Sequence, residues 1–316
     1  GDLPQEGKVL KRTSKKKVYF EAKISPDGNY LSYVTNQLGR YKIYLYNLQT
    51  GKRKKLEADG NKVEQIMDYS YPLITWHPSS RIMAWVEEEE GEIRLTYYDL
   101  DNDEYATRLF LFYEKILDIS YSDDRLKFLI SGVYRGQTDI YIHDIVSATN
   151  ERITNDIADD LNPRFFDNST KILFSSNRNT DALDAGSDIS SIASYYSLFV
   201  YDLESESAEL TRITDRDFIT RKYPYPAGKN EFVFLSDKSG IFNRYFAEYD
   251  SAIAYIDTVT HYRYFTRSYP LTNYRRNIVE HHYTPSSGRY SEVIYHDGRY
   301  HLYEGRTRFD NKSDEI

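Results

Sequence analysis

Residues 22–34 read A-K-I-S-P-D-G-N-Y-L-S-Y-V, and residues 39–51 read G-R-Y-K-I-Y-L-Y-N-L-Q-T-G. Both stretches are rich in tyrosine and alternate apolar with polar residues, which is typical of β-strands. S-P-D-G at residues 25–28 supplies a proline with a fixed φ and a glycine that accepts a positive φ, and N-L-Q-T-G at residues 47–51 marks a second turn. With the basic segment that ends at Leu56, the pattern predicts strand, tight turn, strand, loop, strand, tight turn, strand.

This four-stranded unit recurs along the chain. An aromatic residue marks the second strand of each of the first five units, and the sixth unit offers Val293 or Tyr295 at that place. The five aromatic residues are Tyr33, Trp85, Phe128, Phe174 and Phe234. Four-stranded units about 40 to 60 residues apart are typical of a β-propeller, because each small sheet covers its faces only by packing against its neighbours around a central axis. The sequence therefore predicts an all-β, six-bladed β-propeller of four-stranded blades.

The two ends of the chain are expected to close the ring. Val9–Thr13 has no partner within the first unit, and the last unit reads as only three strands. We expect Val9–Thr13 to be the outer strand of the sixth blade and to pair with His301–Glu304, since such closure removes exposed strand edges. Residues 1–308 would then form a single domain, followed by a polar tail at residues 309–316.

Two long segments are expected between the second and third strands, on one face of the disc. They are residues 178–194 in the fourth unit and residues 237–250 in the fifth unit. This assignment places the third strand of the fifth unit at Ser251–Asp257 and its fourth strand at His261–Thr266. Loops of this length inside a compact domain are usually functional or disordered. We therefore expect a partner-binding surface on this face.

The candidate partner-binding residues lie in these two segments. They are Arg178, Asp181, Phe242, Arg244 and Tyr245. Aromatic residues and arginine are enriched at binding hot spots. The alternative is that the aromatic side chains only pin the loop to its own blade.

The composition narrows the possible classes of function. The chain of 316 residues carries 41 Lys and Arg against 49 Asp and Glu, a formal net charge of -8, which offers no general attraction for nucleic acid. No apolar run approaches the roughly 18 residues of a transmembrane helix, so we expect no direct membrane insertion. Because the chain has no cysteine, thiolate metal sites and thiol nucleophiles are excluded.

Motifs for catalysis or cofactor binding are scarce. The G-x-S-x-G elbow of serine hydrolases does not occur. His281 and His282 are adjacent and would point to opposite faces of a strand, while His296 and His301 flank a hairpin turn, where surface imidazoles compete with a mixed metal site. D-L-D-N-D at residues 99–103 lacks the glycine of a calcium loop and aligns with the hairpin turns. We therefore expect no catalytic residue, no metal and no cofactor.

The repeat S-P-D-G-x-x-L-x-Y, followed by I-Y-L-Y-N-L-x-T-G, resembles that of the TolB-like propeller family. Its members include the periplasmic component of the bacterial Tol system and propellers attached to prolyl peptidases and outer-membrane proteins. The resemblance is strong in the first unit, good in the second to fourth, and weaker in the fifth and sixth.

The resemblance implies a non-catalytic propeller that acts as a protein-interaction module of the bacterial cell envelope. It also implies a periplasmic or outer-membrane-associated location after removal of a leader, with a cytoplasmic location as the alternative. We expect a protein partner from the envelope, without identifying it, and a monomeric isolated domain. The alternative function is a substrate-gating or carbohydrate-processing propeller of an enzyme whose catalytic domain is absent.

Overall fold

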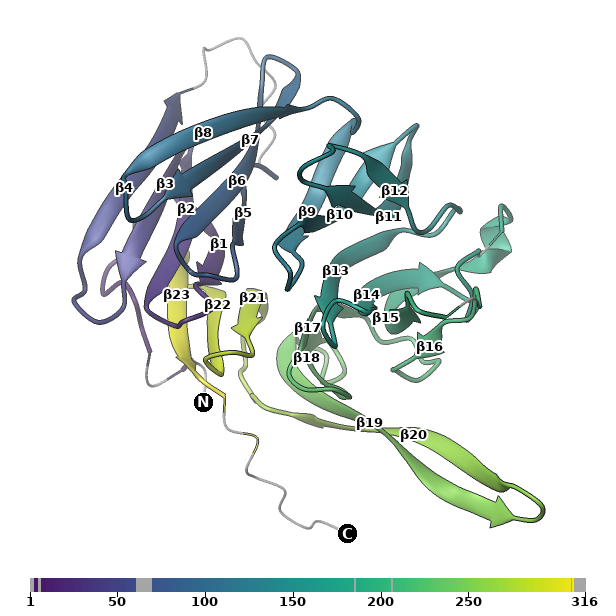
Figure 1. Ribbon diagram of the computed structural model, residues 1–316. Helices are drawn as coiled ribbons and strands as arrows, with labels where there is room; N and C mark the ends of the chain where they lie inside the picture. The colour runs from purple at the N-terminus through teal and green to yellow at the C-terminus, as the bar shows by residue number, and fades with distance from the viewer. Residues whose placement is uncertain are drawn as a thin grey trace.

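The computed structural model describes residues 3–4, 7–60, 70–184, 186–205, 207–307 and 309. In these residues six antiparallel sheets surround a central axis, and the first strand of each sheet is the innermost (Figure 1). Blades one to five each contain four strands in chain order, and blade six contains three. This confirms the predicted six-bladed β-propeller.

The strands follow one another blade by blade. Blade one holds β1 (Val18–Ile24), β2 (Tyr30–Gln37), β3 (Arg40–Asn47) and β4 (Arg53–Gly60); blade two β5 (Leu73–Trp76), β6 (Ile82–Glu89), β7 (Glu92–Asp99) and β8 (Glu104–Phe110); blade three β9 (Lys115–Tyr121), β10 (Lys127–Tyr134), β11 (Gln137–Asp144) and β12 (Asn150–Arg152); blade four β13 (Asp160–Phe166), β14 (Lys171–Arg178), β15 (Ile192–Asp202) and β16 (Thr211–Arg212); blade five β17 (Arg221–Pro226), β18 (Glu231–Ser236), β19 (Asn243–Ile256) and β20 (Thr260–Pro270); blade six β21 (Ile278–Thr284), β22 (Arg289–His296) and β23 (Arg299–Arg306).

The hydrophobic core is divided among the contacts between blades. Apolar side chains from the facing sheets form clusters at all six blade-to-blade contacts. The predicted second-strand positions lie at the centres of these clusters, and in blade six the position is Val293, because Tyr295 is half exposed. Each sheet therefore buries its apolar faces only against its neighbours, as a propeller requires.

The tight turns between first and second strands define one face of the disc, which we call the turn face. At S-P-D-G in blade one, the backbone N–H of Gly28 donates to the carbonyl of Ser25 at 2.8 Å, and Gly28 has the predicted positive φ of 77°. The loops between second and third strands lie on the opposite face, which we call the insertion face. The second-third loops are short in blades one, two, three and six and longer in blades four and five.

Pairing of the two chain ends closes the ring, as predicted. The N–H of Val9 donates to the carbonyl of Leu302 at 2.9 Å, and the N–H of Glu304 donates to the carbonyl of Gly7 at 2.7 Å. The pairing is shorter and begins earlier than the expected strand Val9–Thr13, of which only Val9 takes part. The close approach of the two backbones selects Gly7, since a Cβ there would lie 1.6 Å from the carbonyl oxygen of Glu304.

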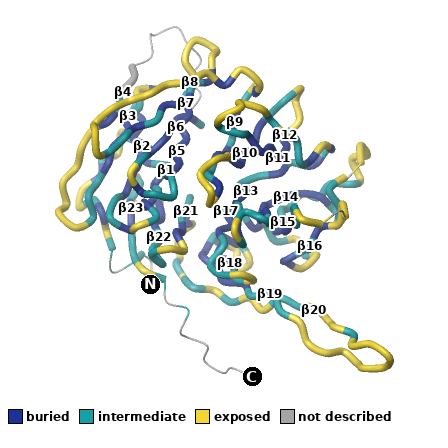
Figure 2. The backbone as a smooth tube through the Cα atoms, viewed as in Figure 1, coloured by how far each residue is buried: buried dark blue, intermediate teal, exposed yellow. Residues whose placement is uncertain are grey.

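The fifth blade corrects the predicted strand boundaries. Residues 237–250 are not a loop, because Asn243–Glu248 pair with β18 as the first half of the third strand. The turn at Asp257 lies where the repeat placed it, but β19 and β20 continue far beyond β18 and form a two-stranded arm, residues 249–267. Figure 2 shows the arm as an exposed projection from the disc. The insertion in this blade therefore lengthens a hairpin between the third and fourth strands.

The long segment in the fourth blade is a loop on the insertion face, as predicted. It runs between β14 and β15 and contains a short 3-10 helix, η1 (Ile189–Ser191). Within the described part of the chain, no helix combines the length and the apolar character needed to cross a membrane.

Candidate functional site

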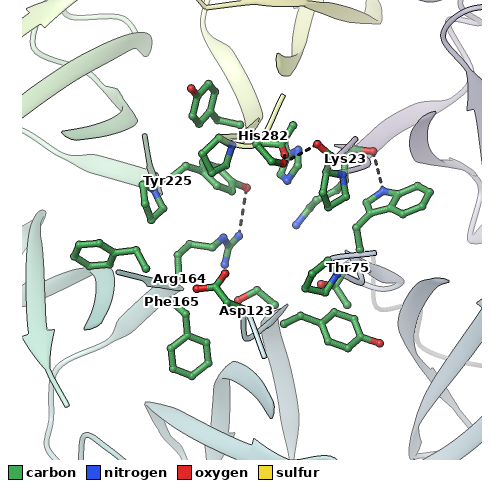
Figure 3. Close-up of a pocket in the computed structure, with 18 of the residues that line it drawn as sticks. Lys23, Thr75, Asp123, Arg164, Phe165, Tyr225 and His282 are labelled. Atoms are coloured by element: carbon green, nitrogen blue, oxygen red, sulfur yellow. Dashed lines mark hydrogen bonds between the residues drawn. The ribbon is translucent and has the colours of Figure 1, made fainter. Parts of the chain in front are cut away.

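A funnel opens on the turn face at the centre of the disc. It has a volume of about 440 Å³ and is lined by the ends of the inner strands and by the first-second turns (Figure 3). A second cavity of about 220 Å³ lies on the same axis. It is lined by residues that come before the funnel residues in the sequence of each inner strand. The two cavities thus follow one another along the axis of the propeller.

Two rings of side chains line these cavities, with one member from each inner strand. The funnel ring lies two positions before each first-second turn and consists of Lys23, Thr75, Ser120, Arg164, Tyr225 and His282. The inner ring lies two positions earlier and consists of Glu21, Leu73, Asp118, Asn162, Tyr223 and Glu280. Because the two cavities lie on the axis, the residues of both rings face it.

Bulges in the inner strands accompany the inner ring. The pairing of β1, β13 and β17 with their neighbours shifts register around Glu21, Asn162 and Tyr223, and each of these residues has a φ of 51°. A positive φ in a residue other than glycine is strained and is found mainly where the surrounding structure fixes it. Because a bulge redirects a side chain, these three bulges hold their side chains at the second cavity.

Arg164 is the most strongly anchored member of the funnel ring. Its Nη1 lies 2.9 Å from Oδ2 of Asp118 in the inner ring, and its Nη2 donates to the hydroxyl of Tyr225 at 3.3 Å. Burial alone would raise the pKa of Asp118, but the charges of Arg164 and Lys23 outweigh burial and lower it. The Asp118 carboxylate is therefore ionised and holds the guanidinium in place.

Lys23 is the second cation of the funnel ring. Its Nζ lies 3.4 Å from Oε2 of Glu21, which also accepts the backbone N–H of Ile74 in the next blade at 2.8 Å. Burial lowers the pKa of Lys23, but the nearby Glu21, Tyr225 and Asp118 outweigh it and raise the pKa above its ordinary value. The ammonium group stays charged at every physiological pH.

Glu280 gives the inner ring an acid with an unusual pKa. Its Oε1 accepts the backbone N–H of Ala22 at 2.9 Å, which links blade six to blade one. Burial, followed by the negative charge of Glu21, raises the pKa of Glu280 to about 7. This carboxyl group is thus part-protonated near neutral pH.

Both adjacent histidines lie between blades, on opposite faces of β21. Nε2 of His281 donates to the carbonyl of Tyr223 at 2.6 Å, and Nδ1 of His282 accepts the N–H of Ile24 at 3.1 Å. Burial holds the pKa of each imidazole well below its ordinary value, and for His282 the charges of Lys23 and Arg164 lower it further. Both imidazoles are therefore neutral and hydrogen-bonded to backbone.

Three of the candidate partner-binding residues lie in the interior, which corrects their placement on an exposed loop. Arg178 is 2% exposed, and its Nη2 donates to both carboxylate oxygens of Asp160 at 2.7 and 2.8 Å. Arg244 pairs with the buried Glu292 of blade six, and Tyr245 packs in the core between blades four and five. Arginine carries five N–H donors in a planar fork, which suits it to a buried carboxylate as well as to a partner surface. Arg178 is thus bound within its own blade, Arg244 and Tyr245 join neighbouring blades, and all three side chains are buried in this structure.

The other two candidates are partly accessible. Asp181 accepts hydrogen bonds from Nε of Arg212 at 2.7 Å and from Nη2 of Arg216 at 2.9 Å, which fixes the fourth-blade loop to its own blade. Nζ of Lys222 lies 3.9 Å from the centre of the half-buried Phe242 ring. Their contacts match the alternative that loop side chains act as anchors, and a partner-binding role for either residue stays a prediction.

One group of acidic side chains in the described residues has the spacing of metal ligands. It consists of Asp139, Asp156 and Asp160, all buried between blades three and four. Arg152 pairs with Asp139, and Arg178 pairs with the other two carboxylates. Two guanidinium groups thus neutralise most of the charge that would attract a cation.

Comparison with known proteins supports the fold. No protein-family model matches the sequence, and no curated protein matches it. The crystal structure of TolB from Acinetobacter baumannii is similar with a TM-score of 0.56 and 14% identity, over 73% of this chain and 52% of that chain, so this chain spans about half of that protein. The structure of putative TolB from Agrobacterium tumefaciens is similar with a TM-score of 0.55 and 17% identity, over 92% and 91% of the two chains.

An enzyme has a comparable likeness. Oligogalacturonate lyase from Vibrio parahaemolyticus is similar with a TM-score of 0.54 and 12% identity, over 96% of this chain and 93% of that chain. Identities this low establish the fold and not the activity. The chain has the β-propeller fold that it shares with the TolB structures and with this lyase.

Proposed function

We propose that this chain is a non-catalytic protein-interaction module of the bacterial cell envelope, and that it receives a segment of its partner in the axial funnel. The observation that carries the proposal is the funnel itself, an open cavity of about 440 Å³ in which two cations are held in fixed positions by the inner ring. A concave site with apolar walls and a few polar groups held in position is what specific ligands require. The likeness to TolB structures supports the periplasm as the location.

The charged and imidazole groups of the funnel ring have structural partners. His282 is neutral and accepts a backbone N–H, Arg164 is paired with Asp118, and Lys23 stays protonated beside Glu21. A general base needs a free site and a pKa near the working pH. These contacts support binding without catalysis.

A second candidate is a carbohydrate-processing propeller. The observation that favours it is the pair of cations at the bottom of the funnel, Lys23 and Arg164, where the carboxylate of an acidic sugar could bind; we call this part, with His282, the funnel floor. A lyase of oligogalacturonate also shares the fold. Cleavage of digalacturonate by the isolated chain, abolished by one substitution in the funnel, would establish this candidate and overturn the first.

The proposed function is tested by photocrosslinking this protein to its partner in an envelope extract and capturing the crosslinked product. Ala227 lines the funnel, and Ala227→Trp fills the cavity without altering the ion pairs below it. Ser239→Trp adds the same bulk at an exposed turn on the insertion face. We expect Ala227→Trp to abolish the crosslinked product and Ser239→Trp to leave it unchanged; the opposite result would move the binding site to the insertion face.

A further inference from the structure

The funnel ring and the inner ring carry opposite charges. Among the six residues of the funnel ring, Lys23 and Arg164 are cations and none is an acid. The inner ring contains three acids and no cation. A ligand that enters from the turn face and passes the rim therefore meets the two cations before it reaches the acids of the inner ring. Figure 3 shows both cationic groups pointing towards the centre of the funnel from opposite sides.

The two cations have donors to offer a ligand. Lys23 has three N–H donors, and in the described part of the chain its ammonium group has one ion pair, at 3.4 Å. Arg164 uses Nη1 for Asp118 and the carbonyl of Pro163, and its contact with the Tyr225 hydroxyl is long at 3.3 Å. Because Nδ1 of His282 accepts a hydrogen bond, its neutral ring carries its proton on Nε2. Two charged donors and one neutral donor thus line the floor.

The walls and the rim limit what kind of anion fits. Besides the two cations, the funnel is lined mainly by apolar and aromatic residues, such as Ile119, Tyr121 and Phe165. Two carboxylates, Asp123 and Asp167, lie in the turns at the rim. An oligomer of acidic sugars would place its outer carboxylates against these rim acids, where like charges repel. A chain with one carboxylate at its tip and apolar residues behind it avoids this repulsion.

We propose that the funnel floor is a carboxylate-binding subsite and that it takes the C-terminal carboxylate of a polypeptide partner, inserted tip first. Lys23 and Arg164 bind the two oxygens, and the aromatic walls contact the last side chains of the partner. This proposal rests on the proposed function, since it names the group that the funnel receives. It assigns the charged floor a role that the likeness of fold does not supply.

Equilibrium dialysis with defined probes tests the subsite. The probes are a pooled library of N-acetylated tripeptides with free C-termini, the same library with C-terminal amides, and digalacturonate, each measured by mass spectrometry. We expect the free acids to be retained at least about tenfold more than the amides. Equal retention of acids and amides, stronger retention of digalacturonate, or no retention of any free acid would overturn the assignment.

Variants of the floor give the second part of the test. Lys23→Gln removes one cation, and the double variant Arg164→Gln, Asp118→Asn removes the other together with its partner, so that no buried charge is left unpaired. Arg135→Gln is the matched loss of charge at an exposed turn on the insertion face. We expect both floor variants to lose the preference for free acids and the control to keep it, with all folds verified by circular dichroism. Retained preference in both floor variants would contradict the proposal.

The two proposals fail in different ways. If free-acid peptides are not retained but Ala227→Trp still abolishes capture of the envelope partner, the carboxylate subsite is wrong and the proposed function stands. If Ala227→Trp does not affect capture, the funnel is not the interaction site and the proposed function fails as well.

Discussion

The two rings on the propeller axis differ by two positions along each inner strand and have opposite charge. The funnel ring holds Lys23 and Arg164, and the inner ring holds Glu21, Asp118 and Glu280. Ion pairs join the rings, within one strand for Lys23 and across neighbouring blades for Arg164. The difference shows that positions two residues apart on the inner strands can carry opposite charges, so that the funnel contains a pair of cations although the protein has a net charge of -8.

The largest expected effect comes from breaking the contact between the rings at Arg164. Arg164→Gln leaves the buried Asp118 without its ionic partner, which should cost about 3–5 kcal/mol of the free energy of unfolding in urea. The double variant with Asp118→Asn should recover most of this loss. Equal losses in the single and double variants would show that the ion pair does not set the stability of the axis.

A second prediction concerns the closed ring that both sets of side chains require. Gly7→Ala should cost about 2–3 kcal/mol, because the added Cβ would overlap the carbonyl of Glu304 and break the closing hydrogen bonds. Gly136→Ala is the matched control, since Gly136 also has a positive φ but has no atoms within 4 Å of an added Cβ. Thermal unfolding measures both variants, and an equal loss in the two would contradict a stabilising role for the closure.

The third prediction concerns Glu280 of the inner ring and the pH dependence of the protein's stability. The pKa of Glu280 is about 7 in the folded protein against 4.5 for an ordinary glutamate, so the folded state keeps a proton that the unfolded state has lost. Its contribution to stability is therefore lost progressively as the pH rises from 4.5 to about 7. Between pH 5 and pH 8, Glu280→Gln should gain on the order of 2 kcal/mol relative to the wild type. The neutral histidines are common to both proteins and cancel in this difference, and parallel stability curves would rule out the shifted carboxyl.

The smallest expected effect lies at the rim. Asp123→Asn removes one exposed carboxylate from the funnel entrance without touching either ring. Affinity for a free-acid tripeptide should rise by about twofold at low salt and return to the wild-type value at high salt, because exposed charges are screened. Isothermal titration at two ionic strengths measures this change. A gain that persists at high salt would point to a steric effect of the substitution.

The repeat in the sequence was sufficient to predict the blades, because turn residues and buried second-strand residues recur at fixed places. Tyr33 and Trp85 lie where the pattern put them, and closure by the N-terminal segment is confirmed. The arm was missed because the hairpin signature fixes the turn near Asp257 but not where the preceding strand begins. Tyrosine and alanine in Asn243–Ile256 suit a strand as well as an exposed loop, and only pairing with β18 decides between them.

The site was harder to predict than the fold. Arginine and aromatic residues are enriched both at partner surfaces and in buried contacts between blades, so the composition of the fifth-blade segment could not distinguish these roles for Arg244 and Tyr245. The funnel residues had a usable signal, because each lies two positions before a predicted turn on an inner strand. That signal gives position only, whereas the pairing of Arg164 with Asp118 depends on two blades meeting at the axis.

The closing hydrogen bonds join residues about 295 positions apart, which sets the order in which the molecule can be completed. Blades one to five contain only local antiparallel hairpins and can form as each segment becomes available, whereas the sixth blade waits for Leu302–Glu304 to meet Gly7–Val9. Contacts between distant residues form slowly because a long loop must first be closed. For that interval the molecule is an open arc that exposes the apolar faces of its first and last blades, and it is during this time that a chaperone would have most to protect.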